Sequence, residues 1–184
     1  MIFDPHASWS ALRERADATE NPLHKKLLDG VANHMEAEIN ARLKPLMATL
    51  TDHPIYHFWQ VGPENMVLEG YDAVAGFYQN MFSTNGQQFQ VVSNRIIVDD
   101  NGVITEGQVR QVYAREALLQ MGVLESRGQP IDSQPLWLSN TQLLTIWPNA
   151  GDGRLLGEDI YFGEDPMTTL SPINEEALPD YFIR

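Results

Sequence analysis

The spacing of hydrophobic residues changes along this chain, and that change limits the fold more than any other feature. From Leu23 to Leu43 apolar residues recur every four positions, which is the period of one face of an amphipathic α-helix. After Asn85-Gly86 apolar residues follow the spacing of β-strands instead. A chain that begins with helices and continues as long hairpins is expected to be an α+β protein and not a strand–helix–strand array.

Local signals place the expected elements. Asn21-Pro22 combines an N-cap with proline at the first helical position and starts the long helix, and Pro45 ends or kinks it. Shorter helices are expected after Asp4-Pro5 and from Gly70, strands over 55–61 and 66–68, and two hairpins, 89–98 with 103–114 and 136–147 with 154–162. The expected organisation is a helical extension at 1–20, an α+β domain at 21–163 and an acidic, extended tail at 164–184.

Long hairpins twist, and a strongly curved sheet leaves a hollow on its concave side that helices can close. The expected fold is therefore a cone-shaped, curved antiparallel sheet closed by the N-terminal helices. A mostly apolar interior with a few polar side chains is the usual form of a small-molecule site. We expect the ligand to be a small hydrophobic molecule held in this cone.

Composition excludes several classes of partner. The chain has 12 basic and 25 acidic residues, a formal net charge of -13, which repels nucleic acid and anionic membranes. It contains no cysteine, so disulfides and thiolate metal sites are excluded. There is no nucleotide-binding fingerprint, signal peptide or apolar run of the roughly 20 residues that a membrane helix needs. We expect a cytoplasmic protein with no cofactor and no nucleic-acid or membrane partner.

Several short motifs, in this order and spacing, resemble the SnoaL-like branch of the nuclear transport factor 2-like superfamily. They are Tyr56-His57, then Gly70 with Ala73-Val74 and Phe77-Tyr78, then Glu106-Gly107, and last the segment from Asp152 to Tyr161. The resemblance runs over roughly positions 22 to 163. It implies a cystatin-like α+β barrel, commonly a homodimer through the outer face of the sheet. Relatives include ketosteroid isomerase, scytalone dehydratase, limonene epoxide hydrolase and polyketide cyclases, which use a carboxylate or histidine in the cone, while others only bind or assemble.

Glu158 is the leading catalytic candidate. It shares one face of the last predicted strand with Leu156, Ile160 and Phe162, and the resemblance implies that this face looks into the cone. A carboxylate among apolar side chains is suited to act as a general base. The alternative is that the strand faces the other way and Glu158 is solvated, as most glutamates are. Ile160 stands where polyketide cyclases carry their catalytic aspartate, so it is expected to line the pocket without that chemistry.

His57 is the second catalytic candidate, because an imidazole can take up or release a proton near neutral pH. A lone histidine in a strand is more often structural, so both interpretations stay open. Tyr56 and Trp59 lie on opposite faces of the strand, and at most one of them can line the pocket. Where ketosteroid isomerase carries its aspartate this chain has Phe58 and Trp59, so that reaction is not expected.

A metal site at His53 and His57, four residues apart, is not expected. Zinc needs at least one further ligand. The sequence has no HExxH helix and no cysteine, and all five histidines lie at or before position 57.

Other residues are candidates for binding a ligand. Glu106 and Arg110 share a strand face and could orient a carbonyl or carboxylate, or could simply be solvated. Tyr78 could point its hydroxyl into the pocket or pack within the core. Trp137 belongs to a strand whose faces are both partly apolar; one face is expected to line the cone, and the other to be buried in a dimer or under the tail or a helix.

Two functions therefore stay open. The first is a cofactor-independent isomerase, dehydratase, hydrolase or cyclase in which Glu158 is the base and His57 or a tyrosine polarises an oxygen. The second is a non-catalytic ligand-binding or dimeric assembly domain. Because a fold fixes the place of a site and not its chemistry, a deep pocket that contains Glu158 would favour the enzyme.

Overall fold

The computed structural model describes residues 3–59 and 65–178 of the chain. Three helices come first: α1 (Ala7–Asp17), α2 (Pro22–Ile39) and α3 (Leu43–Met47). Strands β1 (Leu50–Trp59) and β2 (Met66–Glu69) are followed by α4 (Tyr71–Ser83). The two long hairpins are β3 (Phe89–Asp99) with β4 (Gly102–Ala114), and β7 (Leu136–Pro148) with β8 (Leu155–Phe162). Between and after them lie α5 (Arg115–Gln120), β5 (Glu125–Ser126), β6 (Gln129–Pro130), η1 (Ile131–Ser133), η2 (Pro166–Thr168), β9 (Ser171–Pro172) and η3 (Glu175–Ala177).

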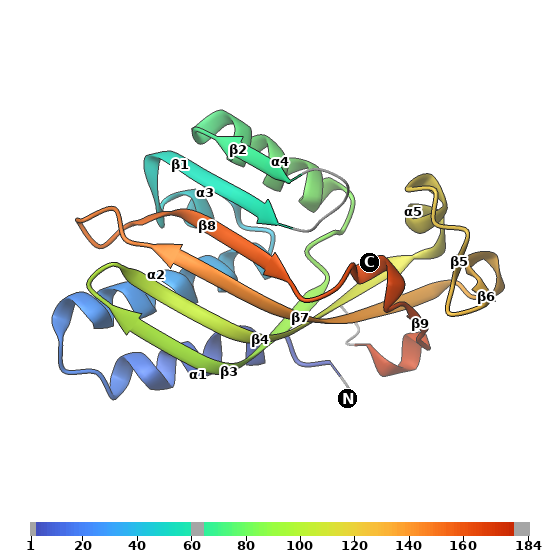
Figure 1. Ribbon diagram of the computed structural model, residues 1–184, viewed down its shortest axis with the longest axis horizontal. Helices are drawn as coiled ribbons and strands as arrows, with labels where there is room; N and C mark the ends of the chain where they lie inside the picture. Colours follow the sequence, from blue (N-terminus) through green and yellow to red (C-terminus); the bar gives the residue numbers. More distant parts are fainter. Residues whose placement is uncertain (1–2, 60–64, 179–184) are drawn as a thin grey trace.

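One curved sheet organises the molecule, with the main strand order β2-β1-β8-β7-β4-β3 and β9 paired to β7. Helices α1 and α2 pack on one face of this sheet, as Figure 1 shows. The expected α+β class is confirmed, with two differences. The sheet is not purely antiparallel, because β1 and β8 run parallel, and it does not close into a barrel. The helices, and not further strand pairing, cover the concave side.

The start of α2 follows the expected signal. The Asn21 side chain accepts hydrogen bonds from the backbone N–H groups of Leu23 and His24, which caps the helix. The helix ends at Ile39 and does not reach Leu43. Pro45 lies in the first turn of α3, where proline is tolerated, so it belongs to a new helix and does not end the long one.

A break in the pairing of β8 decides which side chains face inward. Leu155 of β8 pairs with Leu50 of β1, but Gly157, two residues further along β8, pairs with Ile55, five residues further along β1. An added Cβ at Gly157 would lie 1.7 Å from the Ile55 carbonyl oxygen, so the strands approach closely here. As a result Leu155 is buried and Leu156 is 37% exposed. The expectation that Leu156 shares the inward face with Glu158 was wrong, because it assumed an unbroken strand.

The ends of β4 and β7 carry a small extension at the opposite end of the molecule from the turns of the two hairpins (Figure 1). Leu118, Ile131, Trp137 and Leu170 form its buried cluster. Helix α5 was not expected, because the surrounding sequence is polar and rich in glycine. The stretch 164–178 packs on the rest of the chain, with Leu170 in this cluster and Leu178 in a second one with Val112 and Leu136. The Tyr181-Phe182-Ile183 anchor expected from the sequence lies outside the described residues.

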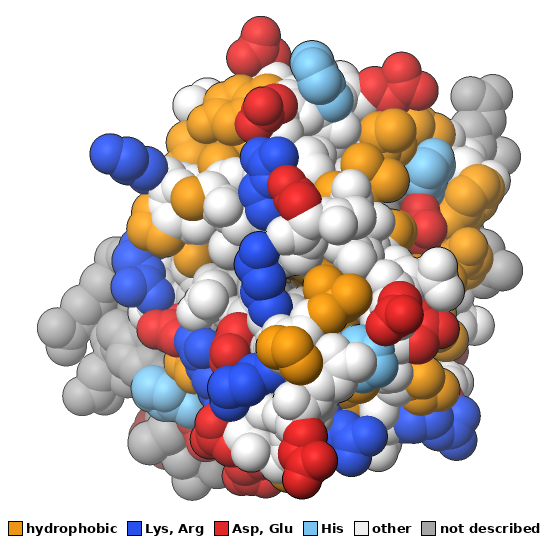
Figure 2. Space-filling model, turned by 90° about the vertical axis from the view of Figure 1, so that its left-hand side faces the viewer, with side chains coloured by type: hydrophobic (Ala, Val, Ile, Leu, Met, Phe, Trp, Pro, Cys, Tyr) orange, Lys and Arg blue, Asp and Glu red, His pale blue; other side chains and the backbone are white. Residues whose placement is uncertain are grey.

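Charges of both signs are interspersed at the end of the molecule that carries the hairpin turns. Figure 2 shows Lys and Arg side chains there lying next to Asp and Glu. Arg154 forms ion pairs with Asp52 and Asp152, and Lys25 with Asp17. On this face, therefore, the positive charges do not gather into a single basic patch. Among the described residues, no helix has both the length and the apolar character needed to cross a membrane.

Candidate functional site

A cavity of about 170 Å³ lies between α2, α4 and the concave face of the sheet. Most of its wall is apolar or aromatic. Its lining residues are Met35, Glu38, Tyr56, Phe58, Phe77, Tyr78, Met81, Phe89, Val91, Thr105, Val109, Gln111, Leu143, Thr145, Trp147, Glu158, Ile160 and Phe162. A minority of them are polar and two are carboxylic acids, which gives the cavity the usual character of a small-molecule site.

Glu158 is buried in this cavity, with 6% of its surface exposed. The Tyr78 hydroxyl donates a hydrogen bond of 3.1 Å to Glu158 Oε1. The Nε2 atom of His34 lies 3.2 Å from the same oxygen. A buried carboxylate needs a donor such as the Tyr78 hydroxyl, since burying an unpaired charge is costly. This hydrogen bond holds Glu158 Oε1 at the cavity wall, with His34 Nε2 beside it.

His34 is completely buried on α2, and its hydrogen bonds indicate where its proton lies. The Thr49 hydroxyl donates to the Leu46 carbonyl oxygen at 2.6 Å. Its oxygen therefore accepts from His34 Nδ1, 2.7 Å away, which assigns a proton to Nδ1. In the neutral ring, Nε2 is then the acceptor, and it faces the tyrosines and Glu158. His34 is thus oriented to take up a proton on the cavity side.

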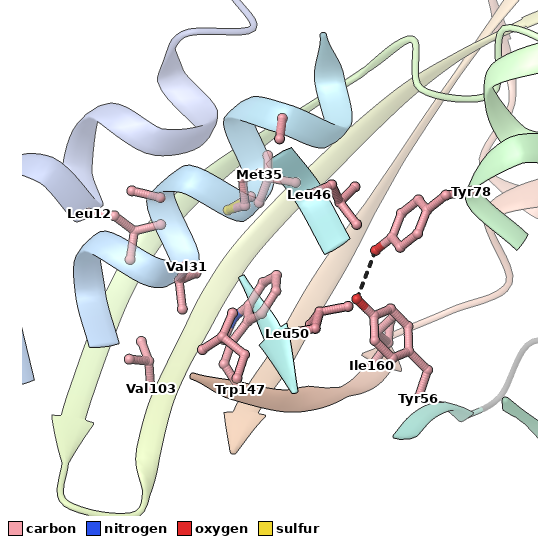
Figure 3. Packing of buried hydrophobic residues seen from close by; sticks show 14 of the residues in the cluster. Leu12, Val31, Met35, Leu46, Leu50, Tyr56, Tyr78, Val103, Trp147 and Ile160 are labelled. Carbon is pink, nitrogen blue, oxygen red and sulfur yellow. Dashed lines mark hydrogen bonds between the residues drawn. The ribbon is translucent and has the colours of Figure 1, made fainter. Parts of the chain in front are cut away.

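Two tyrosines complete the network. The hydroxyl of Tyr78 lies 3.0 Å from the hydroxyl of Tyr56 and 3.0 Å from His34 Nε2, and Tyr56 lies 3.3 Å from the same nitrogen. Figure 3 shows the two hydroxyl groups pointing toward each other. Burial raises the pKa of both tyrosines well above the ordinary value, and the neighbouring Glu158 carboxylate adds to the shift. Both side chains therefore stay protonated at neutral pH and can donate hydrogen bonds.

Glu38 is the second carboxylic acid of the cavity, one helical turn beyond His34 on α2. The residue is half-buried. Its pKa is raised well above the ordinary carboxyl value, first by burial and second by repulsion from Glu158. Two carboxylates that share a site do not both ionise easily. The cavity therefore pairs Glu158, which accepts a hydrogen bond from Tyr78, with Glu38, which tends to keep its proton.

Four residues proposed from the sequence meet at this cavity. Glu158, Tyr56, Tyr78 and Ile160 all belong to its lining. They come from three elements, and β1 and β8 bring two of them together because Tyr56 pairs with Glu158 in the parallel register.

The structure does not bring the other proposed residues to the cavity. His57 and Trp59 stack on each other on the outer face of β1, and His57 Nδ1 lies 2.6 Å from Asp159 Oδ1. Glu106 forms an ion pair with Arg95, which is consistent with the solvated alternative, and Arg110 is not part of the lining. Trp137 belongs to the core of the extension, where its Nε1 donates to the Ile131 carbonyl.

Sequence reasoning missed His34 and Glu38. A signal was present, because His34 follows Val31 by three residues and Glu38 follows His34 by four, the spacing of neighbours on one helix face. Polar residues on an otherwise apolar stripe are candidates for a polar site. Within residues 3–59 and 65–178, no group of three or more His, Asp or Glu side chains is placed to hold a metal ion.

No family model and no curated protein matches the sequence. Solved structures do match. A protein assigned as a SnoaL-like polyketide cyclase from Shewanella putrefaciens superposes with a TM-score of 0.61 at 12% identity, covering 82% of this chain and 86% of that one. This chain has the NTF2-like fold.

Two other structures show how widely this fold is used. A phenazine biosynthesis-related protein from Pseudomonas aeruginosa matches with a TM-score of 0.57 at 13% identity, covering 90% of this chain and 98% of that chain. An LEH-like epoxide hydrolase from M. tuberculosis matches with a TM-score of 0.52 at 20% identity, covering 77% and 85%. The resemblance inferred from the sequence is thus confirmed as an NTF2-like fold, and the fold alone does not choose among these functions.

Proposed function

We propose that this NTF2-like protein binds a small, largely hydrophobic molecule in the cavity and moves a proton on it, with Glu158 as the base. The observation that carries the proposal is the buried Glu158 carboxylate in a mostly apolar cavity, with the Tyr78 hydroxyl as its hydrogen-bond donor and His34 Nε2 beside it as a proton acceptor. A base in a water-poor site is more effective than the same group in water, and the fixed donors cost no rearrangement during reaction.

The residues divide the work as follows. Glu158 accepts a proton from a carbon atom of the substrate or from a water molecule, so the C–H or O–H bond breaks. Tyr78, protonated, donates a hydrogen bond to Glu158 or to an oxygen of the substrate that gains negative charge. His34 Nε2, the acceptor nitrogen of the neutral ring, lies 3.2 Å from Glu158 Oε1 and can take over the proton that Glu158 has removed. The proton then rests on Nε2 of the imidazolium, beside the Glu158 carboxylate, while Tyr78 keeps its own proton.

This first step is shared by isomerases, dehydratases, hydrolases and cyclases that need no cofactor. Structural neighbours named as a SnoaL-like polyketide cyclase, a phenazine biosynthesis-related protein and an LEH-like epoxide hydrolase support ligand binding or catalysis in this fold. Within the proposal, Ile160 and Tyr56 shape the wall. His57, Trp59, Glu106, Arg110 and Trp137 have no part in it.

A second candidate is a non-catalytic ligand-binding or assembly domain that forms a homodimer through the outer face of the sheet. This face favours it because several of its side chains are apolar: Ile97 is 50% exposed, and the rings of Trp59 and Tyr161 stack with centroids 5.8 Å apart. Sedimentation at micromolar concentration tests the dimer. A monomer would contradict it.

A thermal-shift screen with steroids, aromatic polyketides and terpenoid epoxides tests binding. A ligand present at one hundred times its dissociation constant stabilises the folded state by about 2.7 kcal/mol. The screen is run on the wild type, Glu158→Gln and Asp159→Asn, which alters the next carboxylate of β8 on the outer face. We expect a hit whose stabilisation changes only in Glu158→Gln. No hit in any of the three would contradict the proposed site.

A further inference from the structure

The two carboxyl groups of the cavity differ in their hydrogen-bond and ion-pair partners. Glu158 receives the Tyr78 hydroxyl and lies against His34. The Glu38 carboxyl, in contrast, has no hydrogen-bond or ion-pair partner among the described residues, although it lines the same cavity. Because Glu38 is half-buried, its carboxyl group can still contact water in the free protein. A molecule that fills the cavity displaces this water and then has to supply a donor, since a polar group removed from water without a partner is unfavourable.

The rest of the cavity indicates which donor would fit. Seven aromatic residues line it: Tyr56, Phe58, Phe77, Tyr78, Phe89, Trp147 and Phe162. No Lys or Arg is among the described residues of the lining. His34 lies next to Glu158 but is not part of the lining, and its ring nitrogens already contact Thr49 and Tyr78. An anion would meet two carboxyl groups and no cation. A cation would meet carboxylates and aromatic faces, both of which attract positive charge.

We infer that the cavity selects hydrophobic ligands that carry a protonated amine, and that Glu38 is the counter-ion of that amine. This inference rests on the proposed function for the location of the site and adds the chemical class of the ligand. The ammonium group would give Glu38 its missing N–H donors, and the hydrocarbon part would lie against the aromatic wall near Glu158.

Binding of an ammonium group should be coupled to the release of a proton from Glu38. Burial and the Glu158 charge favour the neutral Glu38 carboxyl in the free protein. The other titratable groups at the cavity are His34, Tyr56 and Tyr78, and the two tyrosines stay protonated. A cation at Glu38 favours its ionised form, so the Glu38 proton leaves to solvent when the amine binds. The affinity for the amine should therefore rise as the pH rises through the pKa of Glu38, while the affinity for an uncharged ligand should not.

Three matched probes test the inference: 1-naphthylmethylamine, 1-naphthylmethanol and 1-naphthoic acid, which are cationic, neutral and anionic at pH 7. Titration calorimetry in two buffers of different ionisation enthalpy measures both affinity and proton release. The variants are Glu38→Gln, which keeps the shape of the side chain, and Glu36→Gln, a control on the same helix. Glu36 forms ion pairs with Arg13 and Arg42 and does not line the cavity.

In the wild type and Glu36→Gln we expect the amine to bind roughly tenfold more tightly than the alcohol, as a charge-assisted hydrogen bond predicts. The acid should bind least, and the amine alone should release up to about one proton. Glu38→Gln should abolish both the preference and the proton release while the alcohol still binds. Equal binding of amine and alcohol, or a preference that survives in Glu38→Gln, would overturn the inference and leave the proposed function standing. Failure of all three probes would count against both.

Discussion

A histidine lies beside a carboxylate on each side of the sheet, and the two pairs differ in how deeply they are buried. On the concave side His34 lies 3.2 Å from Glu158, with side chains that are 0% and 8% exposed. On the outer side His57 lies 2.6 Å from Asp159, with side chains that are 33% and 27% exposed. Glu158 and Asp159 are neighbours in β8, so the alternation of one strand separates the two sites.

The surroundings of the two pairs differ more than the pairs themselves. The inner pair shares hydrogen bonds with two protonated tyrosines and borders a cavity. The outer pair is flanked by the stacked rings of Trp59 and Tyr161 and does not line that cavity. A histidine and a carboxylate in contact are thus not sufficient for a site. The inner pair is the candidate because Glu158 lines a mostly apolar cavity that can hold a small molecule.

Removing each carboxylate should separate the two faces most strongly. For a substrate identified by the ligand screen, we expect Glu158→Gln to lower kcat by roughly 10²- to 10⁴-fold, the usual contribution of a general base. Asp159→Asn should leave kcat within about twofold, because no proton moves on the outer face. Steady-state kinetics on the three proteins measure this. Equal losses in both variants would abolish the distinction between the faces.

Removing each histidine should separate the faces in stability. His34→Leu leaves partners of the buried network unsatisfied, at a cost of about 1–3 kcal/mol in the free energy of unfolding. His57→Leu removes a partly exposed pair, for which about 0–1 kcal/mol is expected. Urea denaturation of both variants gives the two values. A larger loss for His57→Leu would mean that the outer pair is the structural one.

Removing a single hydroxyl group from each face should also affect the inner face more than the outer one. Tyr78→Phe should lower the free energy of unfolding by about 1 kcal/mol, because Glu158 loses a donor while the ring and its packing remain. Tyr161→Phe, on the outer face, should change it by less than about 0.5 kcal/mol, since its ring is 37% exposed. If the two variants are equally stable, the Tyr78 hydrogen bond contributes nothing net.

The smallest expected effect is a dependence of stability on pH that arises from Glu38. Its pKa is raised on folding above the ordinary value of 4.5, so the folded state binds the proton more tightly than the unfolded state. The resulting stabilisation is present below the unfolded pKa and is lost as the pH rises through the folded pKa. Glu38→Gln should therefore flatten the fall in stability above about pH 4.5, and Glu36→Gln should not. Denaturation at several pH values checks the slopes.

Much of the fold could be predicted from local signals. The change of hydrophobic spacing gave the helices-then-hairpins order, and Asn21-Pro22 marked the start of α2. The parallel pairing of β1 with β8 could not be predicted, because it joins segments about a hundred residues apart and has no local signature. The irregularity near Gly157 was missed for the same reason, since it follows from how closely Ile55 approaches.

Part of the candidate site could also be predicted from the sequence. The alternation of side chains in β8 indicated Glu158, although it placed Leu156 on the wrong face. His57 was proposed because it is a histidine in a predicted strand, whereas His34 was not proposed because it lies among the apolar residues of α2. What makes His34 a candidate is its contact with Glu158, 124 positions away in the sequence, and only the folded chain provides that contact.

If a proton moves at the inner face as proposed, Glu158 should catalyse hydrogen–deuterium exchange into a bound ligand. A ligand from the screen with an acidic C–H bond is incubated in D2O with the wild type, Glu158→Gln or Asp159→Asn, and deuterium incorporation is followed by mass spectrometry. The account predicts incorporation with the wild type and Asp159→Asn and little with Glu158→Gln. Undiminished incorporation with Glu158→Gln, or its loss only in Asp159→Asn, would contradict it.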